Sequence, residues 1–270
     1  MADLGISLAL IAAIVLLSEA ARRATARLFC EDYWIYLVEA VSTFQLCACT
    51  HELKLLGEVG RIESYVGLTL TYIMTAVHIS TFRCASCNPN GTLENVYRGH
   101  ISRKAAAALV ACQFSAAVVA QFASAWLWTL GLSDLHVQHE KFGFRCFDPI
   151  SGTLVEAAAV ELACAFTVQA AVLHIHKLDE KLRVHAGAAV ITLLVYAAGS
   201  ISGAVFNPVL AFSIQFPCSG HTYLEYCFVY WLGPVLGMSS CILLFEKIIP
   251  FLSGKSTTGL DVPAVQKKIQ

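Results

Sequence analysis

The chain has 270 residues, of which 57 % are hydrophobic and 14 % are charged, and its mean hydropathy is +0.65. Soluble domains carry about 25 % charged residues, so the composition excludes an ordinary soluble domain. The net charge of −1 gives no reason to expect a nucleic-acid partner. We therefore expect a membrane protein whose surroundings are the lipid bilayer.

Apolar runs recur along the whole chain, and each approaches the roughly 20 residues that a helix needs to cross a bilayer. The runs are 4–21, 33–50, 64–82, 105–130, 153–175, 186–206 and 226–250. The first run has no Lys or Arg before it, which argues against a cleaved signal peptide. It is either a seventh span or a helix that lies in the membrane interface. The pattern predicts an all-α membrane protein.

The basic residues are concentrated in alternate connections between the runs. If residues 22–27 are cytosolic and the sides alternate from there, 14 of the 18 Lys and Arg are cytosolic. The other four are Lys54, Arg61, Lys141 and Arg145. Such a bias agrees with the positive-inside rule and predicts a cytosolic C-terminus.

A pattern in the second apolar run returns in the fifth. A carboxylate is followed by a small side chain four positions later and then by Phe, at Glu39–Phe44 and at Glu161–Phe166. In each half, another apolar run then leads to an Asn-Pro pair. Each half has three spans, an odd number, so the two halves have opposite orientations in the membrane. The functional site of such an inverted repeat is expected near the midplane, where the halves meet.

This repeat divides the chain into five segments. They are an N-terminal apolar helix with a basic cytosolic segment (1–30), the first repeat (31–130), an exoplasmic connecting loop (131–152), the second repeat (153–250) and a cytosolic tail (251–270). The tail ends with Lys267 and Lys268 at the fourth and third positions from the C-terminus. They resemble a dilysine signal for retrieval to the endoplasmic reticulum, although short basic tails are also common without one.

The pairs Asn88-Pro89 and Asn207-Pro208 predict helix starts, because Asn caps free backbone N–H groups and Pro is tolerated at the first helical position. The apolar segments that follow, 89–99 and 208–217, are too short to cross a membrane. We expect re-entrant half-helices whose N-termini face each other near the bilayer centre. Each N-terminus carries about half a positive charge, which opposes cations and lets neutral solutes pass. A lone Asn-Pro pair would more often be a loop turn, but two repeat-related pairs favour half-helices.

Glu39 and Glu161 lie inside apolar spans, where an ionisable group is costly. We expect both side chains to face the bundle interior and to accept hydrogen bonds from loop backbone near the half-helices. The alternative is a proton-carrying site. No intramembrane Lys or Arg accompanies the two glutamates, so the structural interpretation is favoured.

Several cysteines and histidines have residue types that can bind metals. Cys84 and Cys87 form a CxxC pair, which can mark a zinc or redox site, but close packing at a pore mouth is favoured because no second pair follows. His136 and His139 are expected at a surface or at the membrane interface, so no metal site is predicted. Cys146 and Cys218 are the cysteines in predicted exoplasmic loops, where a disulfide is chemically possible.

These motifs together resemble the aquaporin, or major intrinsic protein, family over about residues 33–250. The resemblance is carried by the paired Asn-Pro loops, by Glu39-x-x-x-Thr43 and by Tyr230-Trp-Leu-Gly233-Pro234. Strings at 43–53, 18–24 and 218–226 resemble the divergent intracellular branch that holds aquaporin-11 and aquaporin-12, the last two being more like aquaporin-12.

The resemblance implies an aquaporin-like bundle of six transmembrane helices plus two half-helices, here with an extra N-terminal helix. It further implies a homotetramer with one pore per subunit in an intracellular membrane. Such a protein needs no cofactor and is not an enzyme. Gly233 and Pro234 would support the fold, and Cys218 would matter for folding or assembly.

The altered motif positions set the expected selectivity. The two Asn-Pro-Ala boxes read Asn88-Pro89-Asn90 and Asn207-Pro208-Val209. By the resemblance, the filter positions are Leu210, where orthodox members have Arg, together with Ala204 and Val195. The fourth filter position is Tyr65, or Leu68 if the loop before Asn88 has the usual length.

An apolar filter without a fixed positive charge suggests slower passage of water and easier passage of less polar neutral solutes such as glycerol or hydrogen peroxide. We therefore expect a passive channel for water and small neutral solutes. The alternative is a closed or very slow pore in a structural or adhesion protein.

Overall fold

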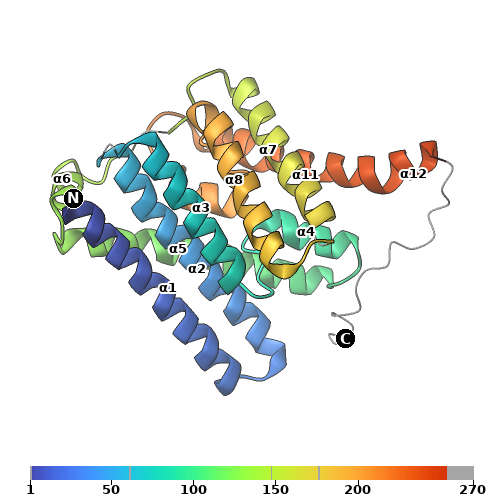
Figure 1. The fold of residues 1–270 in the computed structure, drawn as a ribbon, viewed down its shortest axis with the longest axis horizontal. Helices are drawn as coiled ribbons and strands as arrows, with labels where there is room; N and C mark the ends of the chain where they lie inside the picture. Colours follow the sequence, from blue (N-terminus) through green and yellow to red (C-terminus); the bar gives the residue numbers. More distant parts are fainter. Residues whose placement is uncertain (1, 61, 147, 176, 254–270) are drawn as a thin grey trace.

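The computed structural model describes residues 2–60, 62–146, 148–175 and 177–253, and the long elements in these ranges are helices (Figure 1). In chain order they are α1 (Ala2–Leu28), α2 (Glu31–Glu58), α3 (Ser64–Thr81), α4 (Pro89–Tyr97), α5 (Arg103–Thr129), α6 (Asp134–Lys141), α7 (Leu154–Ile175), α8 (Glu180–Ser202), α9 (Pro208–Ile214), α10 (Tyr223–Cys227), η1 (Phe228–Leu232), α11 (Gly233–Leu243), η2 (Leu244–Ile248) and α12 (Ile249–Leu252). The elements from α10 to α12 follow one another without a break, and η1 and η2 are π-helical turns within that long segment.

The two repeats contain the same order of elements. The first consists of α2, α3, the short helix α4 and α5, and the second of α7, α8, the short helix α9 and the segment from α10 to α12. In each repeat the first long helix packs on the last, α2 on α5 and α7 on α11. Helices α3 and α8 pack on each other across the repeats. The all-α architecture predicted from the sequence is therefore confirmed, with α1 as an additional helix.

Five helical segments in the described part of the chain are long and apolar enough to cross a membrane: α1, α5, α7, α8 and the segment Tyr223–Leu252. The sequence predicted seven such runs, and α2 and α3 do not reach the same apolar content. In α2 the reason is a set of polar side chains that face the protein interior. Glu39, Gln45 and Glu52 are all buried, so the low hydropathy of α2 reflects internal contacts.

Helix α1 packs along α2 and is therefore a helix of the bundle, and its length and apolar composition are sufficient for it to cross a membrane. Ile11 of α1 forms a buried cluster with Cys49 of α2 and Met74 of α3. Its buried face also contains Ser7, Ser18 and Arg22. Polar side chains on this face are expected only where the helix has partners in the protein.

Close contact between α7 and α11 depends on two glycines. A Cβ atom at Gly233 would lie 2.8 Å from the carbonyl oxygen of Ala158, and one at Gly237 would lie 2.2 Å from that of Leu162. Pro234 is buried in the first turn of α11. Backbones that approach this closely are typical of helix packing in membranes, where small residues replace the hydrophobic drive.

The sequence placed some boundaries wrongly. The run 186–206 was predicted as one span, but α8 ends at Ser202, because Gly203 adopts a left-handed conformation with φ of 85°. A Cβ atom at position 203 would lie 2.8 Å from Pro149 Cγ, so glycine fits there best. The connecting loop 131–152 contains an unpredicted helix, α6, whose N-cap Ser133 accepts a hydrogen bond from the His136 N–H.

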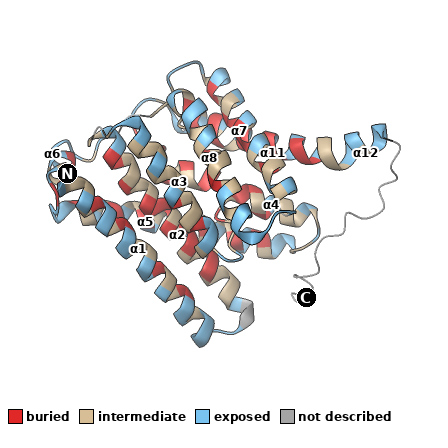
Figure 2. Cartoon of the chain, in the orientation of Figure 1, coloured by how far each residue is buried: buried red, intermediate tan, exposed pale blue. Residues whose placement is uncertain are grey.

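Buried residues are concentrated on the helix faces that meet within the bundle, and much of the outer surface is exposed (Figure 2). Large apolar side chains such as Phe122, Leu193 and Tyr196 are among the exposed ones. An apolar outer surface of this kind suits contact with lipid, because the backbone polar groups of each helix are paired internally.

Candidate functional site

The site is built from two short helices that begin at the Asn-Pro pairs. Asn88 Oδ1 accepts a hydrogen bond from the Asn90 N–H at 3.0 Å, and Pro89 is the first residue of α4. Asn207 Oδ1 accepts from the N–H groups of Val209 and Leu210, at 3.1 and 3.4 Å. Both predicted helix starts are therefore present, and in both the asparagine satisfies backbone N–H groups that the helix leaves free.

The two half-helices meet inside the bundle. Asn207 Nδ2 donates a hydrogen bond to the carbonyl oxygen of Cys87, the residue before Asn88, at 2.8 Å. Helices α4 and α9 also contact each other. The amide of Asn207 has a second hydrogen, and Asn88 Nδ2 has no acceptor among the residues that the structure describes. Both asparagines therefore keep a donor for another molecule at the point where the two N-termini meet.

The third residue of each motif packs its half-helix into the bundle. Val209 is fully buried in a cluster with Cys47 and Ala48 of α2 and with residues of α5. Asn90 is also buried, and its Oδ1 has no hydrogen-bond partner in the described part of the chain. These positions therefore shape the contact between the half-helices and the long helices.

Glu161 holds the loop that precedes Asn207. Its Oε1 accepts hydrogen bonds from the Ser202 hydroxyl at 2.6 Å and from the Val205 N–H at 3.0 Å, and its Oε2 accepts from the Phe206 N–H at 2.5 Å. The carboxylate is fully buried. Its hydrogen-bonding capacity is directed to the loop, as the structural interpretation expects.

Glu39 makes the equivalent contacts in the first repeat. Its carboxylate accepts from the N–H groups of Ser86 and Cys87, at 3.0 and 2.7 Å, and from the Ser86 hydroxyl at 3.0 Å. Gln113 Nε2 of α5 donates at 2.6 Å to Glu39 Oε1, the oxygen that also accepts from the Cys87 N–H and from the Ser86 hydroxyl. The two glutamates thus bind the backbone directly before Asn88 and Asn207.

The backbone at these places is one that L-residues avoid. Cys87 and Phe206, each directly before an asparagine, have φ of 49° and 39°. A left-handed conformation costs a residue with a Cβ atom roughly 1–2 kcal/mol. The hydrogen bonds to Glu39 and Glu161 offset this cost, because they form only when the N–H groups turn toward the carboxylates.

Two side chains that take part in this arrangement, Gln113 and Tyr230, were given no contact with it in the sequence analysis. Gln113 is fully buried and also donates to Ser86 Oγ and to Thr92 Oγ1, at 3.0 and 3.1 Å. The Tyr230 hydroxyl donates to the carbonyl oxygen of Ser202 at 2.7 Å. A Gln within the apolar run 105–130 is a signal that would have found Gln113, because polar residues inside a span usually have a partner.

The predicted filter residues lie in three separate places. Val195 and Ala204 belong to one apolar cluster, which also includes Phe206. Leu210 packs against two other clusters, one of which contains Tyr230 and the other Val209. Tyr65 lies in the first turn of α3 and is 66 % exposed. The structure does not bring Tyr65 into the cluster of Val195 and Ala204, and the same is true of the alternative residue, Leu68.

His136 and His139 were expected at a surface or at the membrane interface, and the expectation of an exposed surface position is wrong because both side chains are buried. His136 Nε2 lies 3.1 Å from Glu52 Oε1, which also accepts from the Ser7 hydroxyl at 2.5 Å. Glu52 Oε2 accepts from Trp128 Nε1 at 2.9 Å. The error arose because His136 and Glu52 are 84 positions apart, so no local pattern reveals the pair.

A disulfide joins Cys146 in the connecting loop to Cys218 after α9, the two cysteines for which the sequence allows one. Next to it, Lys54 Nζ donates to the carbonyl oxygen of Ile214 and to Gln215 Oε1, at 2.6 and 2.7 Å. A cation at the C-terminal end of α9 is favourable because this end carries partial negative charge.

The remaining predictions concern metals and the tail. Cys84 is exposed, Cys87 is buried and both are free thiols. Among the described residues, no group of three or more His, Cys, Asp or Glu could hold a metal ion. Lys267 and Lys268 lie outside the described residues.

Comparison with known proteins places the chain among relatives of one kind. A family model described as "Major intrinsic protein" matches residues 39–245. "Aquaporin-11" of Homo sapiens is 39 % identical over 222 residues, which are 82 % of this chain and 81 % of the relative. "Aquaporin-12" of Mus musculus is 34 % identical over 257 residues, 93 % of this chain and 89 % of the relative. Of these two, the first match has the higher identity and the second the greater length.

Proposed function

The chain belongs to the major intrinsic protein family, and on that premise we propose that it is a passive channel for water and small neutral solutes. The observation that carries the proposal is the meeting of the two half-helices through the hydrogen bond from Asn207 Nδ2 to the Cys87 carbonyl. It leaves amide hydrogens of Asn88 and Asn207 available to a passing solute. Two converging helix N-termini oppose cations at the same point.

We propose that the filter favours solutes less polar than water. Leu210, Ala204 and Val195 have apolar side chains, so these three filter positions offer neither a fixed charge nor a side-chain hydrogen-bond donor. A solute that enters there loses hydrogen bonds to water without replacing them, a cost that rises with the polarity of the solute. Glycerol and hydrogen peroxide are therefore the candidate solutes beside water.

For assembly and location, we propose a homotetramer with one pore per subunit in the endoplasmic reticulum or in intracellular vesicles. The distribution of Lys and Arg supports a cytosolic C-terminus. The positions of Lys267 and Lys268 support retrieval to the endoplasmic reticulum, because a dilysine signal acts from a cytosolic C-terminus.

The second candidate is a closed or very slow pore in a structural or adhesion protein. It is favoured by the apolar cluster in which Val195, Ala204 and Phe206 meet, because side chains that pack on one another narrow the path. This candidate predicts that neither water nor peroxide crosses a membrane that contains the protein faster than a membrane without it.

The deciding experiment measures shrinkage of proteoliposomes in hyperosmotic buffer by stopped flow. We expect proteoliposomes with the full chain to shrink faster than empty liposomes, and Ala204→Trp to abolish the difference because indole fills the filter. Val172→Trp, an exposed position on the outer face of α7, is the matched control and should leave the rate unchanged. Equal rates with and without protein, at a protein load verified by gel, would favour the closed pore.

A further inference from the structure

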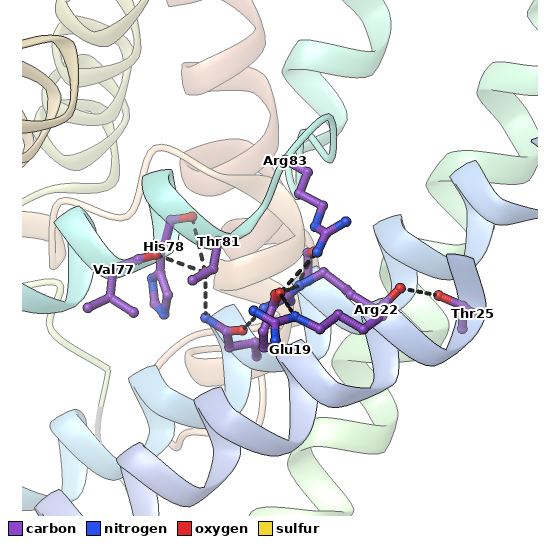
Figure 3. A network of polar contacts seen from close by, with 10 residues as sticks. Glu19, Arg22, Thr25, Val77, His78, Thr81 and Arg83 are labelled. Atoms are coloured by element: carbon purple, nitrogen blue, oxygen red, sulfur yellow. Dashed lines mark hydrogen bonds and ion pairs between the residues drawn. The ribbon is translucent and has the colours of Figure 1, made fainter. Parts of the chain in front are cut away.

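Arg22 of the additional helix α1 is fully buried, although it carries a charge. Its Nη2 donates to Gln45 Oε1 at 2.8 Å and its Nη1 to Ser42 Oγ at 3.3 Å, both on α2. Its Nε lies 3.1 Å from Glu19 Oε2, within α1 (Figure 3). A buried guanidinium is tolerated only with such partners, so α1 is fixed on α2 at this point.

An ion pair of Glu19 connects α1 to the loop that leads to Asn88. Glu19 Oε1 pairs with Arg83 Nη2 at 2.9 Å, and Arg83 lies in that loop, five positions before Asn88 (Figure 3). Gln45 Nε2 donates to Thr81 Oγ1, at the last residue of α3, at 3.2 Å. We call Glu19, Arg22, Gln45, Thr81 and Arg83 the N-terminal clamp.

The loop before Asn88 is therefore held by two carboxylates. Glu39 of α2 binds the N–H groups of Ser86 and Cys87, and Glu19 of α1 binds Arg83, whose φ of 58° is also left-handed. Arg83 thus has an unfavourable backbone conformation that a side-chain contact helps to maintain.

The second repeat has a different arrangement in the described part of the chain. Glu161 binds the loop before Asn207, as Glu39 does in the first repeat. The helix that precedes α7 is α6, however, and it packs on α5 rather than on the second repeat. In the first repeat, therefore, the additional helix α1 contacts the loop before the half-helix α4.

We propose that Glu19 is a positioning residue for the pore: through Arg83 it sets the place of the loop 82–88 and hence of Asn88, so that permeation depends on α1. The proposal rests on the channel function proposed above. It assigns to the extra helix a role in permeation.

The chain contains a close control for this contact. Arg23 Nε also pairs with Glu19 Oε1, at 2.8 Å, but Arg23 lies on α1 and its side chain is 69 % exposed. Arg23→Gln removes a bond to the same carboxylate oxygen without touching the loop, whereas Arg83→Gln removes the bond to the loop. Arg83→Lys keeps the charge and serves as the conservative variant.

The chain also contains its own reporters. Cys87 is buried directly before Asn88, and Cys47 and Cys49 are buried within the long helix α2. In full-length protein in liposomes, the rate of maleimide labelling of each cysteine is measured by peptide mass spectrometry. Labelling of Cys87 follows local opening of the loop, whereas labelling of Cys47 and Cys49 follows opening of the bundle.

In Arg83→Gln, we expect maleimide to label Cys87 about two- to fivefold faster than in the wild type. Loss of a partly exposed ion pair changes the equilibrium constant for opening of the loop by about this factor. Cys47 and Cys49 should be unchanged, Arg23→Gln should match the wild type, and Arg83→Lys should restore slow labelling. In stopped flow, water permeability should fall in Arg83→Gln and recover in Arg83→Lys.

Equal labelling rates at Cys87 in Arg83→Gln and Arg23→Gln would overturn the proposal. Faster labelling of Cys47 and Cys49 together with Cys87 would also overturn it, because it would indicate that the whole bundle is destabilised. Faster Cys87 labelling with wild-type permeability would likewise overturn the proposal. If the wild type conducts no faster than empty liposomes while the labelling pattern holds, the proposed function fails and the clamp remains as a loop-positioning contact.

Discussion

At the scale of single residues, Asn88 and Asn207 each follow a residue with left-handed backbone whose N–H group donates to a buried glutamate. The sequence predicts this arrangement in outline, because Glu39 and Glu161 are ionisable groups within apolar spans at repeat-related positions. It does not predict the side chains that complete each network. Gln113 meets Glu39 from 74 positions away, and such a distance leaves no local pattern.

Glu161→Gln should destabilise the protein while Glu156→Gln should not. The amide has one acceptor oxygen, so it cannot accept from Ser202, Val205 and Phe206 together, and hydrogen bonds to a charged group are worth about 2 kcal/mol each. Glu156, in the first turn of the same helix, is exposed, and in the described part of the chain its carboxylate bonds to Thr153 alone. Thermal unfolding in detergent, followed by intrinsic fluorescence, measures both. An equal drop in the midpoint for the two variants would contradict the role of Glu161.

The stability of the protein should depend on the ionisation of Asp148, a residue of the connecting loop. Burial tends to raise the pKa of Asp148, but hydrogen bonds from His221 and Tyr226 outweigh it, so the net pKa lies below the ordinary value of about 4. The ionised form is therefore favoured by folding. This stabilisation is complete above about pH 4 and is lost as the pH falls through the lowered pKa of the folded state.

Asp148→Asn should remove that part of the pH dependence. The thermal midpoint of the wild type is expected to fall below about pH 4, with a smaller fall in Asp148→Asn, because the amide does not titrate. Midpoints measured from pH 3 to pH 7 give the comparison. Parallel profiles for the two proteins would show that Asp148 does not contribute.

At the scale of elements, the close approach of α7 and α11 explains why glycines occur in the last segment. The resemblance predicts from the sequence that Gly233 supports the fold, and the apolar runs predict the long helices. The sequence misses α6, which has eight residues and a polar composition typical of a loop. It also misses the π-helical turns η1 and η2, which depend on how the last segment packs against its neighbours.

Gly237→Ala tests this packing. The added Cβ atom would lie 2.2 Å from the Leu162 carbonyl oxygen, so the helices must separate, and overpacking of this kind costs about 1–3 kcal/mol. Gly5→Ala in α1 is the matched control, because a Cβ atom there meets nothing within 4 Å. Its expected effect is a gain of up to about 1 kcal/mol, since alanine favours helix. The account of the α7–α11 contact fails if the two variants have the same thermal midpoint.

Helix α1 shows the limit of apolar runs as evidence. The run 4–21 leaves a spanning helix and an interfacial helix equally open. The contacts that attach α1 to α2, Ser7 with Glu52 and Arg22 with Gln45, join residues 45 and 23 positions apart. In the sequence these polar residues look like breaks in an apolar run, and only the neighbouring helix α2 turns them into attachment points.

At the scale of the whole molecule, the half-helices of the two repeats meet at the centre, and a disulfide joins the connecting loop to the second repeat. The Cys146–Cys218 disulfide closes a loop over 72 positions that includes α7, α8 and α9. A cross-link of this kind stabilises by about 2–4 kcal/mol, because it restricts the unfolded chain. Cys146→Ser and Cys218→Ser should therefore lower the thermal midpoint equally, and the double variant no further. Cys227→Ser, at a free thiol, should not lower it. Unequal single variants would indicate a separate role for one cysteine.

The central claim is that two opposed half-helices form a path for neutral solutes that excludes charge. Hydrogen peroxide uptake and proton flux, measured in the same proteoliposomes with dyes enclosed in the lumen, test it most directly. The account predicts that the protein accelerates peroxide entry, that Ala204→Trp abolishes the acceleration, and that proton flux stays at the level of empty liposomes. Proton flux that rises together with peroxide entry, or peroxide entry that the protein does not change, would contradict it.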